Sequence, residues 1–359
     1  MLRLFTRRPN LRAAASSLER YRIAVEVRDR FVTFLERAQD RELFHFNPRY
    51  LAERLGLDER ATLKLLLAAL YEGIVTLHWD VRCPACGAIS HHGSTLSGLR
   101  HDTRCSVCQT EYAPRLDDEV RVTFSPHSRL RALSPAADNA EFREQIDTRL
   151  GPVSGQALLL LPDFRRLFPQ EHVLPDESLE VSRVALIFTD LAGSTALYAA
   201  RGDPRAYHLV RLHFDELFAV ADDHNGAVVK NIGDAVMAAF QTPAEALDAA
   251  LAMQRGIDAL NRGQSLTAAE RLILKVGLHS GPCLNVTLND RPDYFGTTVN
   301  IAARVQGLSH GGDIVFTDTI RSDSDAQAVM GNQPLESILV TLKGIEGQLL
   351  VHRMTVFGG

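Results

Sequence analysis

The segment GAVVKNIGDAVMAAF, residues 226–240, constrains the fold more than any other part of the sequence. Two runs of strand-forming residues, about 227–231 and 235–240, flank the polar turn Ile232-Gly233-Asp234, and this pattern is typical of a β-hairpin. Lys230 stands four residues before Asp234, so one short turn carries a cation and a carboxylate. A turn aspartate often serves only the turn itself, so the hairpin alone leaves a structural and a functional interpretation open.

A second acidic position follows the apolar run VALIFTD, residues 184–190, which predicts a buried strand ending in Asp190. In the next stretch, LAGST, Gly193 permits close backbone approach, and Ser194 or Thr195 can cap a helix. A carboxylate beside the free amides of a helix start suits a metal-bound phosphate, although many strands end in Asp for structural reasons alone. If the hairpin lies beside this strand, Asp190 and Asp234 can face each other and bind hard divalent ions.

A third polar group lies in RPDYFGTTVNIAARVQGLS, residues 291–309, where we predict a helix over 298–308. Asn300 and Arg304 are then at i and i+4 on one helix face and can reach the same ligand. Arg304 offers a planar fork of donors for phosphate oxygens, and Asn300 can hold a ribose oxygen. Asp293 is an acceptor close to them in sequence. A solvated helix face is the competing interpretation.

Four of the five cysteines form two CxxC pairs, Cys83 with Cys86 and Cys105 with Cys108. This spacing predicts one closed four-cysteine zinc site in a small ribbon, which leaves no open position for chemistry. Redox-active thiols or plain buried cysteines are the alternatives. His91, His92 and His101 could substitute as ligands, but the cysteines suffice and we expect these histidines at the surface. Cys283 and His279, near a strand end, are expected to be buried packing residues.

The part of the chain before Val181 predicts several small modules. We expect a helix over about 18–41, then a helix, a turn at Gly56, a helix from Asp58 and a strand from Ile74, the outline of a winged helix-turn-helix. A small helical packing module is the competing interpretation, because the second helix is Leu- and Ala-rich and poorly equipped to contact bases. Residues 119–124 read as a strand, and 156–161 as a buried strand or helix.

The expected divisions are a helical region 1–43, a winged-helix-like module 44–80, a zinc ribbon 81–125, a strand segment with linker 126–180, and a final domain 181–359.

The net charge and the hydropathy of the chain say little about its partners. The net charge of −5 is mild and argues neither for nucleic acid nor for a membrane surface as a partner. No apolar run is long enough to span a bilayer, and the basic start lacks a secretory cleavage pattern, so we expect a cytoplasmic protein.

Four ordered motifs, FTDLAGST, VVKNIGDAVMAAF, VGLHSGP and DYFGTTVNIAARV, together resemble the catalytic domain of class III nucleotidyl cyclases, in the adenylyl cyclase branch. The resemblance covers about Val181 to Met354. It implies an α+β fold with a ferredoxin-like βαββαβ core, which forms a head-to-tail homodimer with active sites at the subunit interface. The first half of the chain is similar to an accessory region of some bacterial cyclases and is expected to regulate the enzyme.

The resemblance also assigns roles. Asp190 and Asp234, with Leu191 in the same set, correspond to the ligands of two Mg²⁺ or Mn²⁺ ions. Lys230 and Asp293 correspond to the pair that recognises adenine. Asn300 and Arg304 correspond to the residues that orient the ribose and stabilise the transition state.

Gly193, Ser194, Thr195 and Lys343 are the expected triphosphate contacts, although a lysine at a hairpin turn such as Lys343 is often only solvated. The implied activity is an adenylate cyclase that converts ATP to 3′,5′-cyclic AMP and pyrophosphate. The alternative is a nucleic-acid-binding or signalling regulator whose cyclase domain senses nucleotide without turnover.

Overall fold

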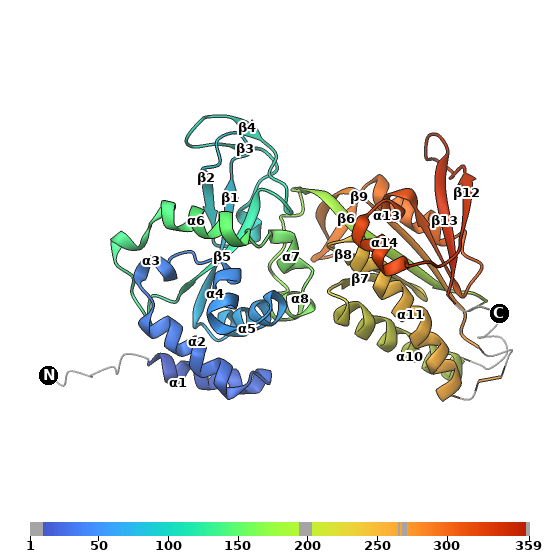
Figure 1. The fold of residues 1–359 in the computed structure, drawn as a ribbon, viewed down its shortest axis with the longest axis horizontal. Helices are drawn as coiled ribbons and strands as arrows, with labels where there is room; N and C mark the ends of the chain where they lie inside the picture. Colours follow the sequence, from blue (N-terminus) through green and yellow to red (C-terminus); the bar gives the residue numbers. More distant parts are fainter. Residues whose placement is uncertain (1–9, 194–202, 265, 268–270, 357–359) are drawn as a thin grey trace. The chain divides into compact units, whose positions relative to one another are not determined.

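The computed structural model describes residues 10–193, 203–264, 266–267 and 271–356. The chain divides into two compact units (Figure 1), one of residues 1–159 and 163–173 and the other of residues 160–162 and 174–359. No helix in the described ranges is both long and apolar enough to cross a membrane. Ser194 and Thr195, predicted as nucleotide contacts, lie outside the described residues.

The second unit is built on one mixed sheet, one part of which has the strand order β9-β6-β8-β7 with β7 at the edge. In chain order its first elements are β6 Leu179–Leu191, α10 Asp203–Asp223, β7 Ala227–Ile232, β8 Ala235–Phe240, α11 Pro243–Gly263 and β9 Leu274–Leu288. Neighbouring strands in this group are antiparallel, and each helix joins two strands that are separated by one other strand. This is a βαββαβ arrangement, so the expected α+β class is confirmed.

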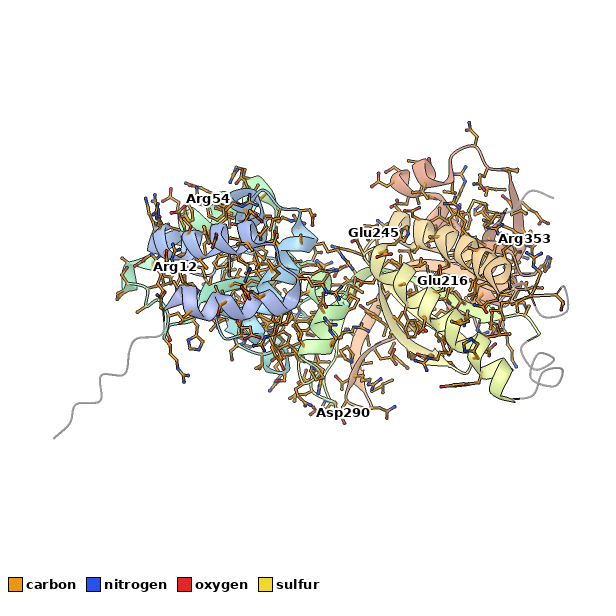
Figure 2. The ribbon with its side chains drawn as sticks, turned by 90° about the horizontal axis from the view of Figure 1, so that it is seen from below. Arg12, Arg54, Glu216, Glu245, Asp290 and Arg353 are labelled. Carbon is orange, nitrogen blue, oxygen red and sulfur yellow. The ribbon has the colours of Figure 1, made fainter. Side chains whose placement is uncertain are left out.

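The rest of the unit extends the sheet beyond β9. Its elements are β10 Arg291–Phe295, α12 Thr297–Gln306, β11 Asp313–Thr317, α13 Asp318–Arg321, α14 Ser324–Met330, β12 Leu335–Val340 and β13 Leu349–Thr355. Strands β11, β13 and β12 follow β9 in that order, while β10 forms a hairpin with the end of β9. Asp290 lies at the tip of this hairpin (Figure 2), where Asn289 and Asp290 both have positive φ, as a tight hairpin turn requires.

The sheet has an apolar cluster on each face. Helices α10 and α11 lie together on one face (Figure 1), where their side chains pack with Ile187, Phe240 and Phe316. Helix α12 covers the other face with Ile301 and Val305. Along β11, Ile314 and Phe316 join the first cluster and Val315 joins the second, as the alternation of strand side chains requires.

Close packing fixes the position of α12 on the sheet. A Cβ atom at Gly277 in β9 would lie only 2.1 Å from the backbone nitrogen of Gln306, near the end of α12. The other end is held by the Thr298 hydroxyl, which donates to the Pro282 carbonyl at 2.5 Å. Glycine at position 277 therefore lets the helix approach β9 closely, and this contact positions Asn300 and Arg304.

The first unit combines helices with a three-stranded antiparallel sheet of order β2-β1-β5. Its elements are α1 Leu11–Ala15, η1 Ser16–Tyr21, α2 Val25–Arg37, α3 Asp40–Leu43, α4 Pro48–Leu55, α5 Glu59–Tyr71, β1 Val75–Arg82, β2 Ile89–Gly93, η2 Leu96–Gly98, β3 Thr103–Arg104, β4 Glu111–Tyr112, β5 Val120–Pro126, η3 Pro135–Ala137, α6 Ala140–Leu150, α7 Gly155–Leu159 and α8 Pro162–Leu167.

One sequence prediction needs correction here, and one open alternative is resolved. The continuous helix over 18–41 is wrong, because a 3₁₀ turn ends at Tyr21, Arg22 adopts a left-handed conformation with φ +58°, and α2 begins only at Val25. The strand-or-helix segment 156–161 forms the short helix α7. The expected order of helix, Gly56 turn, helix and strand is present. The strand β1 that follows these helices pairs with β2 and with β5, and β5 lies beyond the cysteine segment. A winged-helix module confined to residues 44–80 does not include these two partner strands, so that prediction is not confirmed.

His279, in β9, gives the second unit a defined response to acid. Its ring is buried and Nδ1 lies 2.7 Å from the Thr317 hydroxyl, and burial lowers its pKa from 6.5 to about 4. The unfolded chain therefore binds more protons than the folded one between pH 6.5 and 4, so the free energy of unfolding falls as the pH falls through that window. We predict that wild type loses on the order of 3 kcal/mol more stability than His279→Gln between pH 7 and 4. Denaturant unfolding at several pH values measures this difference, and equal slopes for the two proteins would contradict it.

Candidate active site

The two aspartates predicted to face each other come from neighbouring strands. Asp190 is at the end of β6, and the ladder between β6 and β8 pairs the preceding residue, Thr189, with Val236. Asp234 is in the β7–β8 turn, two residues before Val236 and directly after Gly233, which has φ +64°. The Thr189 hydroxyl also accepts a hydrogen bond from the Val236 amide at 3.3 Å. The hairpin therefore lies beside the Asp190 strand, as the sequence predicts.

The electrostatics of this carboxylate pair favour a bound cation. Burial, and then the charge of Asp234, raise the pKa of Asp190, while the Leu191 amide and Lys275 act in the opposite direction. The Oδ2 atom of Asp234 is buried and has no hydrogen-bond partner among the described residues. Two carboxylates that are close together and partly desolvated are a typical oxygen donor set for a hard divalent ion. Asp190 and Asp234 thus fit the metal that the sequence predicts.

Two residues near this pair were not recognised from the sequence. Lys275 of β9 is the ladder partner of Asp190, and its charge stabilises the Asp190 carboxylate. His213 of α10 is fully buried, and burial holds its pKa at about 4 despite an opposing effect from Asp234. The imidazole is therefore neutral at pH 7 and gives the carboxylates no compensating charge. Strand register and helix packing, which a single sequence does not specify, determine both positions.

The second predicted pair is joined by an ion pair. Lys230 of β7 donates from Nζ to Oδ2 of Asp293 at 2.5 Å, and the side chains are 35% and 8% exposed. Oδ1 of Asp293 accepts from the Tyr294 amide at 2.8 Å. Strands β7 and β10 are brought together although the two residues are 63 positions apart. Among the described residues, no hydrogen bond or ion pair connects this pair to the Asp190 and Asp234 carboxylates.

The helix residues are presented by α12. Asn300 is exposed and Arg304 half-buried, so Asn300 is accessible both to solvent and to a ligand. The Arg304 guanidinium has no carboxylate partner in the part of the chain that the structure describes. It lies beside the β12–β13 loop, since a Cβ at Gly344 would be 3.6 Å from Nη2 of Arg304. Lys343 is exposed in the same loop, so two cationic side chains share this region of the domain.

The remaining predicted positions lie at the end of β6 and in β9. Leu191 is its last residue and is buried. Gly193 has φ +73° in the turn that follows, and a Cβ atom there would meet nothing within 4 Å. In β9, His279 and Cys283 are both buried, as expected of packing residues.

The four cysteines of the first unit come together as the CxxC spacing predicts. All four Sγ atoms lie within 4.8 Å of one another, and the Cys83–Cys108 and Cys86–Cys105 sulfur pairs are each 3.7 Å apart. Tetrahedral Zn²⁺ with bonds of about 2.3 Å places its sulfur ligands about 3.8 Å apart. The donor set fits one structural zinc ion.

Comparison with known families agrees with this division of the chain. Residues 12–146 match a family of unknown function, DUF5939. Residues 177–344 match the family described as the adenylate and guanylate cyclase catalytic domain. The second match includes the carboxylate pair, the Lys230–Asp293 pair, α12 and Lys343. The second unit therefore carries an adenylate and guanylate cyclase catalytic domain over residues 177–344.

Individual relatives show the extent of the similarity. An adenylate cyclase of Anabaena cylindrica is 28% identical over 182 residues, which cover 45% of this chain and 36% of that protein. A putative adenylate cyclase of Rhizobium meliloti (strain 1021) is 29% identical over 145 residues, which cover 40% of this chain and 24% of that protein. The crystal structure of the adenylyl cyclase CyaB from P. aeruginosa is 22% identical, with a TM-score of 0.43, and covers 50% of this chain and 95% of that one. This chain thus spans well under half the length of both curated relatives.

The raised pKa of Asp190 leads to a test of the carboxylate pair. Folding raises the pKa of the Asp190 carboxyl group, so ionising this group costs more in the folded state than in the unfolded state. At every pH above the raised pKa, the ionised carboxylate therefore destabilises the folded protein. We predict that Asp190→Asn raises the melting temperature by about 1–3 °C in buffer without Mg²⁺ or Mn²⁺ at pH 7.5. Adding Mn²⁺ should then stabilise wild type more than the variant, because a ligand stabilises the state that binds it.

Differential scanning fluorimetry measures both effects. Asp325→Asn, which changes an exposed carboxylate on α14, is the matched control and should leave both values unchanged. A lower melting temperature for Asp190→Asn without metal, or an equal Mn²⁺ shift for variant and wild type, would contradict the assignment.

Proposed function

We propose that this protein is an adenylate cyclase that converts ATP to 3′,5′-cyclic AMP and pyrophosphate at composite active sites of a homodimer. The observation that carries the proposal is the Lys230–Asp293 pair, a cationic donor held beside a buried acceptor. It stands in a cyclase domain that also retains both carboxylates for metal binding.

The donor and acceptor pattern of this pair selects the base. Adenine presents an acceptor at N1 and donors at N6, which match Lys230 and Asp293 respectively. Guanine has a carbonyl at position 6 and a donor at N1, so each protein group would meet the wrong partner. An unmatched buried polar group costs about 1–3 kcal/mol, and such mismatches are the usual basis of strong substrate discrimination. The two side chains satisfy each other through their ion pair, and a bound adenine would take over the hydrogen bonds of both.

The other side chains act on the sugar and phosphates. Asn300 is exposed on α12 and available to hold the ribose. Arg304, one turn further on and without a carboxylate partner in the described part of the chain, would stabilise negative charge that grows on the α-phosphoryl group. Lys343 in the neighbouring loop would contact the triphosphate. Each of these groups is a donor aimed at an anionic or polar part of ATP.

The proposed reaction is an intramolecular displacement. The ribose 3′-oxygen forms a bond to the α-phosphorus and loses its proton, while the bond from that phosphorus to the bridging oxygen of pyrophosphate breaks. Two Mg²⁺ or Mn²⁺ ions held by Asp190 and Asp234 would lower the pKa of the 3′-hydroxyl and neutralise the triphosphate. The protein side chains orient the sugar and hold the base, so that the attacking oxygen and the leaving group are in line.

Exposed apolar side chains beside the site support dimerisation. Ile232, at the end of β7, is 56% exposed, and Phe295, at the end of β10, is 64% exposed. Both are close in sequence to the Lys230–Asp293 pair, and exposed large apolar residues next to a functional site often mark an interface. In a symmetric dimer, each site would combine the carboxylates of one subunit with the base and ribose residues of the other. The unit of DUF5939 would then regulate that assembly.

Cyclic nucleotide production by the full-length protein tests this proposal directly. With Mn²⁺ and either ATP or GTP, we expect cyclic AMP from ATP and at least 10-fold lower kcat/KM with GTP. Asp190→Ala and Asp234→Ala should each lose at least 100-fold in kcat, because the carboxylates act on the reacting groups. Lys230→Ala should leave little activity with ATP and remove the preference for ATP over GTP, because the donor to N1 is lost.

Asp325→Ala removes an exposed carboxylate outside the site and should keep wild-type activity. Equal or faster turnover of GTP would overturn the base assignment. No product above the level of Asp190→Ala, with either nucleotide, would overturn the proposed activity.

A further inference from the structure

A cluster of histidines and one buried aspartate lies on the polar face of the β2-β1-β5 sheet in the first unit. Along β1, Leu77, Trp79 and Val81 are buried apolar residues, and His78 and Asp80 alternate with them on the opposite face. On the neighbouring strands, His92 is the ladder partner of Asp80 and Thr123 that of His78. Polar side chains therefore gather on one face of the sheet.

Three side chains from three separate elements converge on one point of this face. They are Asp80 from β1, His92 from β2 and His45 from the connection between α3 and α4, and their ligand atoms all lie within 4.8 Å of one another. Nδ1 of His92 is 2.6 Å from Oδ1 of Asp80. Nδ1 of His45 is 3.2 Å and 3.1 Å from the two oxygens of the same carboxylate. Both imidazoles thus present the same ring nitrogen to one carboxylate.

The His45 ring is held in place before any ligand arrives. Its backbone amide donates to the Ser125 hydroxyl at 3.0 Å, and the next residue, Phe46, bridges to Phe124 of β5. The ring stacks between His78, at a centroid distance of 3.8 Å, and Phe44, at 4.4 Å. His78 itself makes hydrogen-bond contacts to the Thr76 and Ser125 hydroxyls through Nε2. Rigid ligands of this kind lower the cost of assembling a metal site.

The aspartate is oriented in the same way. Its side chain is 1% exposed, and the Thr123 hydroxyl donates to Oδ2 at 2.7 Å. Hydrogen bonds from a second layer of residues commonly orient metal ligands and tune them. His92, in contrast, is 51% exposed at its side chain, so the cluster is open to solvent on that side and an ion has a path of entry.

We propose that His45, Asp80 and His92 form a second metal site, distinct from the four-cysteine cluster, which binds a divalent transition-metal ion such as Zn²⁺. Ligands with bonds of about 2.0–2.2 Å around a tetrahedral ion lie about 3.3–3.5 Å apart. The His45–Asp80 distances of 3.1 Å and 3.2 Å are already close to this spacing. The exposed His92 would have to move outward by less than 1 Å.

The donor set defines the class of ion. Two imidazoles and one carboxylate suit Zn²⁺ and other first-row transition metals, whereas Mg²⁺ and Ca²⁺ prefer oxygen ligands. Three protein ligands leave one position for water or a further ligand. The alternative is a hydrogen-bonded triad in which both imidazoles simply donate to Asp80, and the two arrangements differ in metal content.

The zinc content of the full-length protein distinguishes the metal site from the hydrogen-bonded triad. Wild type and variants would be dialysed against a small excess of Zn²⁺ and then metal-free buffer, and bound zinc measured by inductively coupled plasma mass spectrometry. We expect two zinc ions per chain for wild type, one for His92→Ala, one for Cys108→Ala and none for the double variant. His91→Ala, which removes the exposed neighbour on the same strand, is the matched control and should retain two.

Circular dichroism verifies that each variant is folded, and His92→Gln provides a second variant if His92→Ala is not. Loading with Co²⁺ adds a spectroscopic criterion. The thiolate charge-transfer band should persist in His92→Ala and disappear in Cys108→Ala. The same zinc content in wild type and in both folded His92 variants would overturn the proposal and leave the hydrogen-bonded triad.

Discussion

The second unit depends on the placement of two like charges at the ends of neighbouring strands. Strand β6 lies between β8 and β9 at the centre of the sheet, so Asp190 has no freedom to move away from the turn that carries Asp234. Burial and the second carboxylate both raise the pKa of Asp190. The proposed binding of divalent ions would offset this cost, and such an exchange of stability for function is common.

The surrounding elements follow from that constraint. The β7–β8 hairpin carries Asp234 at its tip and Lys230 four residues earlier, so it belongs to the carboxylate pair and the Lys230–Asp293 pair at once. Helix α12 lies against β9 through the close approach at Gly277 and holds Asn300 and Arg304 one turn apart. The sheet therefore sets the relative positions of the carboxylate pair, the Lys230–Asp293 pair and the α12 side chains, which is what the proposed displacement at phosphorus requires of a protein.

Much of this site could be predicted from the sequence because its parts are local. The hairpin with Asp234 was recognised from strand-forming runs around a glycine turn, and Asn300 and Arg304 from helical spacing. The cysteine cluster followed from two CxxC pairs. The strand order, in contrast, came only from resemblance to a family, because residue patterns within one strand do not specify its neighbours.

Long-range contacts account for what the sequence did not predict. His45, Asp80 and His92 lie on three elements separated by 35 and 12 positions, and no short motif joins them. His92 was expected to be an ordinary surface residue, and it is half-exposed yet bonded to a buried aspartate. The helix break at Arg22 depends on a left-handed residue that the apolar spacing does not reveal. In each case tertiary packing, rather than local preference, decided the outcome.

The central claim is that each active site combines residues of two chains. The most direct measurement is the activity of a heterodimer that contains one Asp190→Ala chain and one Lys230→Ala chain, purified through two different affinity tags. One of its two sites would be intact, so cyclic AMP production should reach about half the wild-type rate, although each homodimer is nearly inactive. A heterodimer no more active than either homodimer would contradict the composite site.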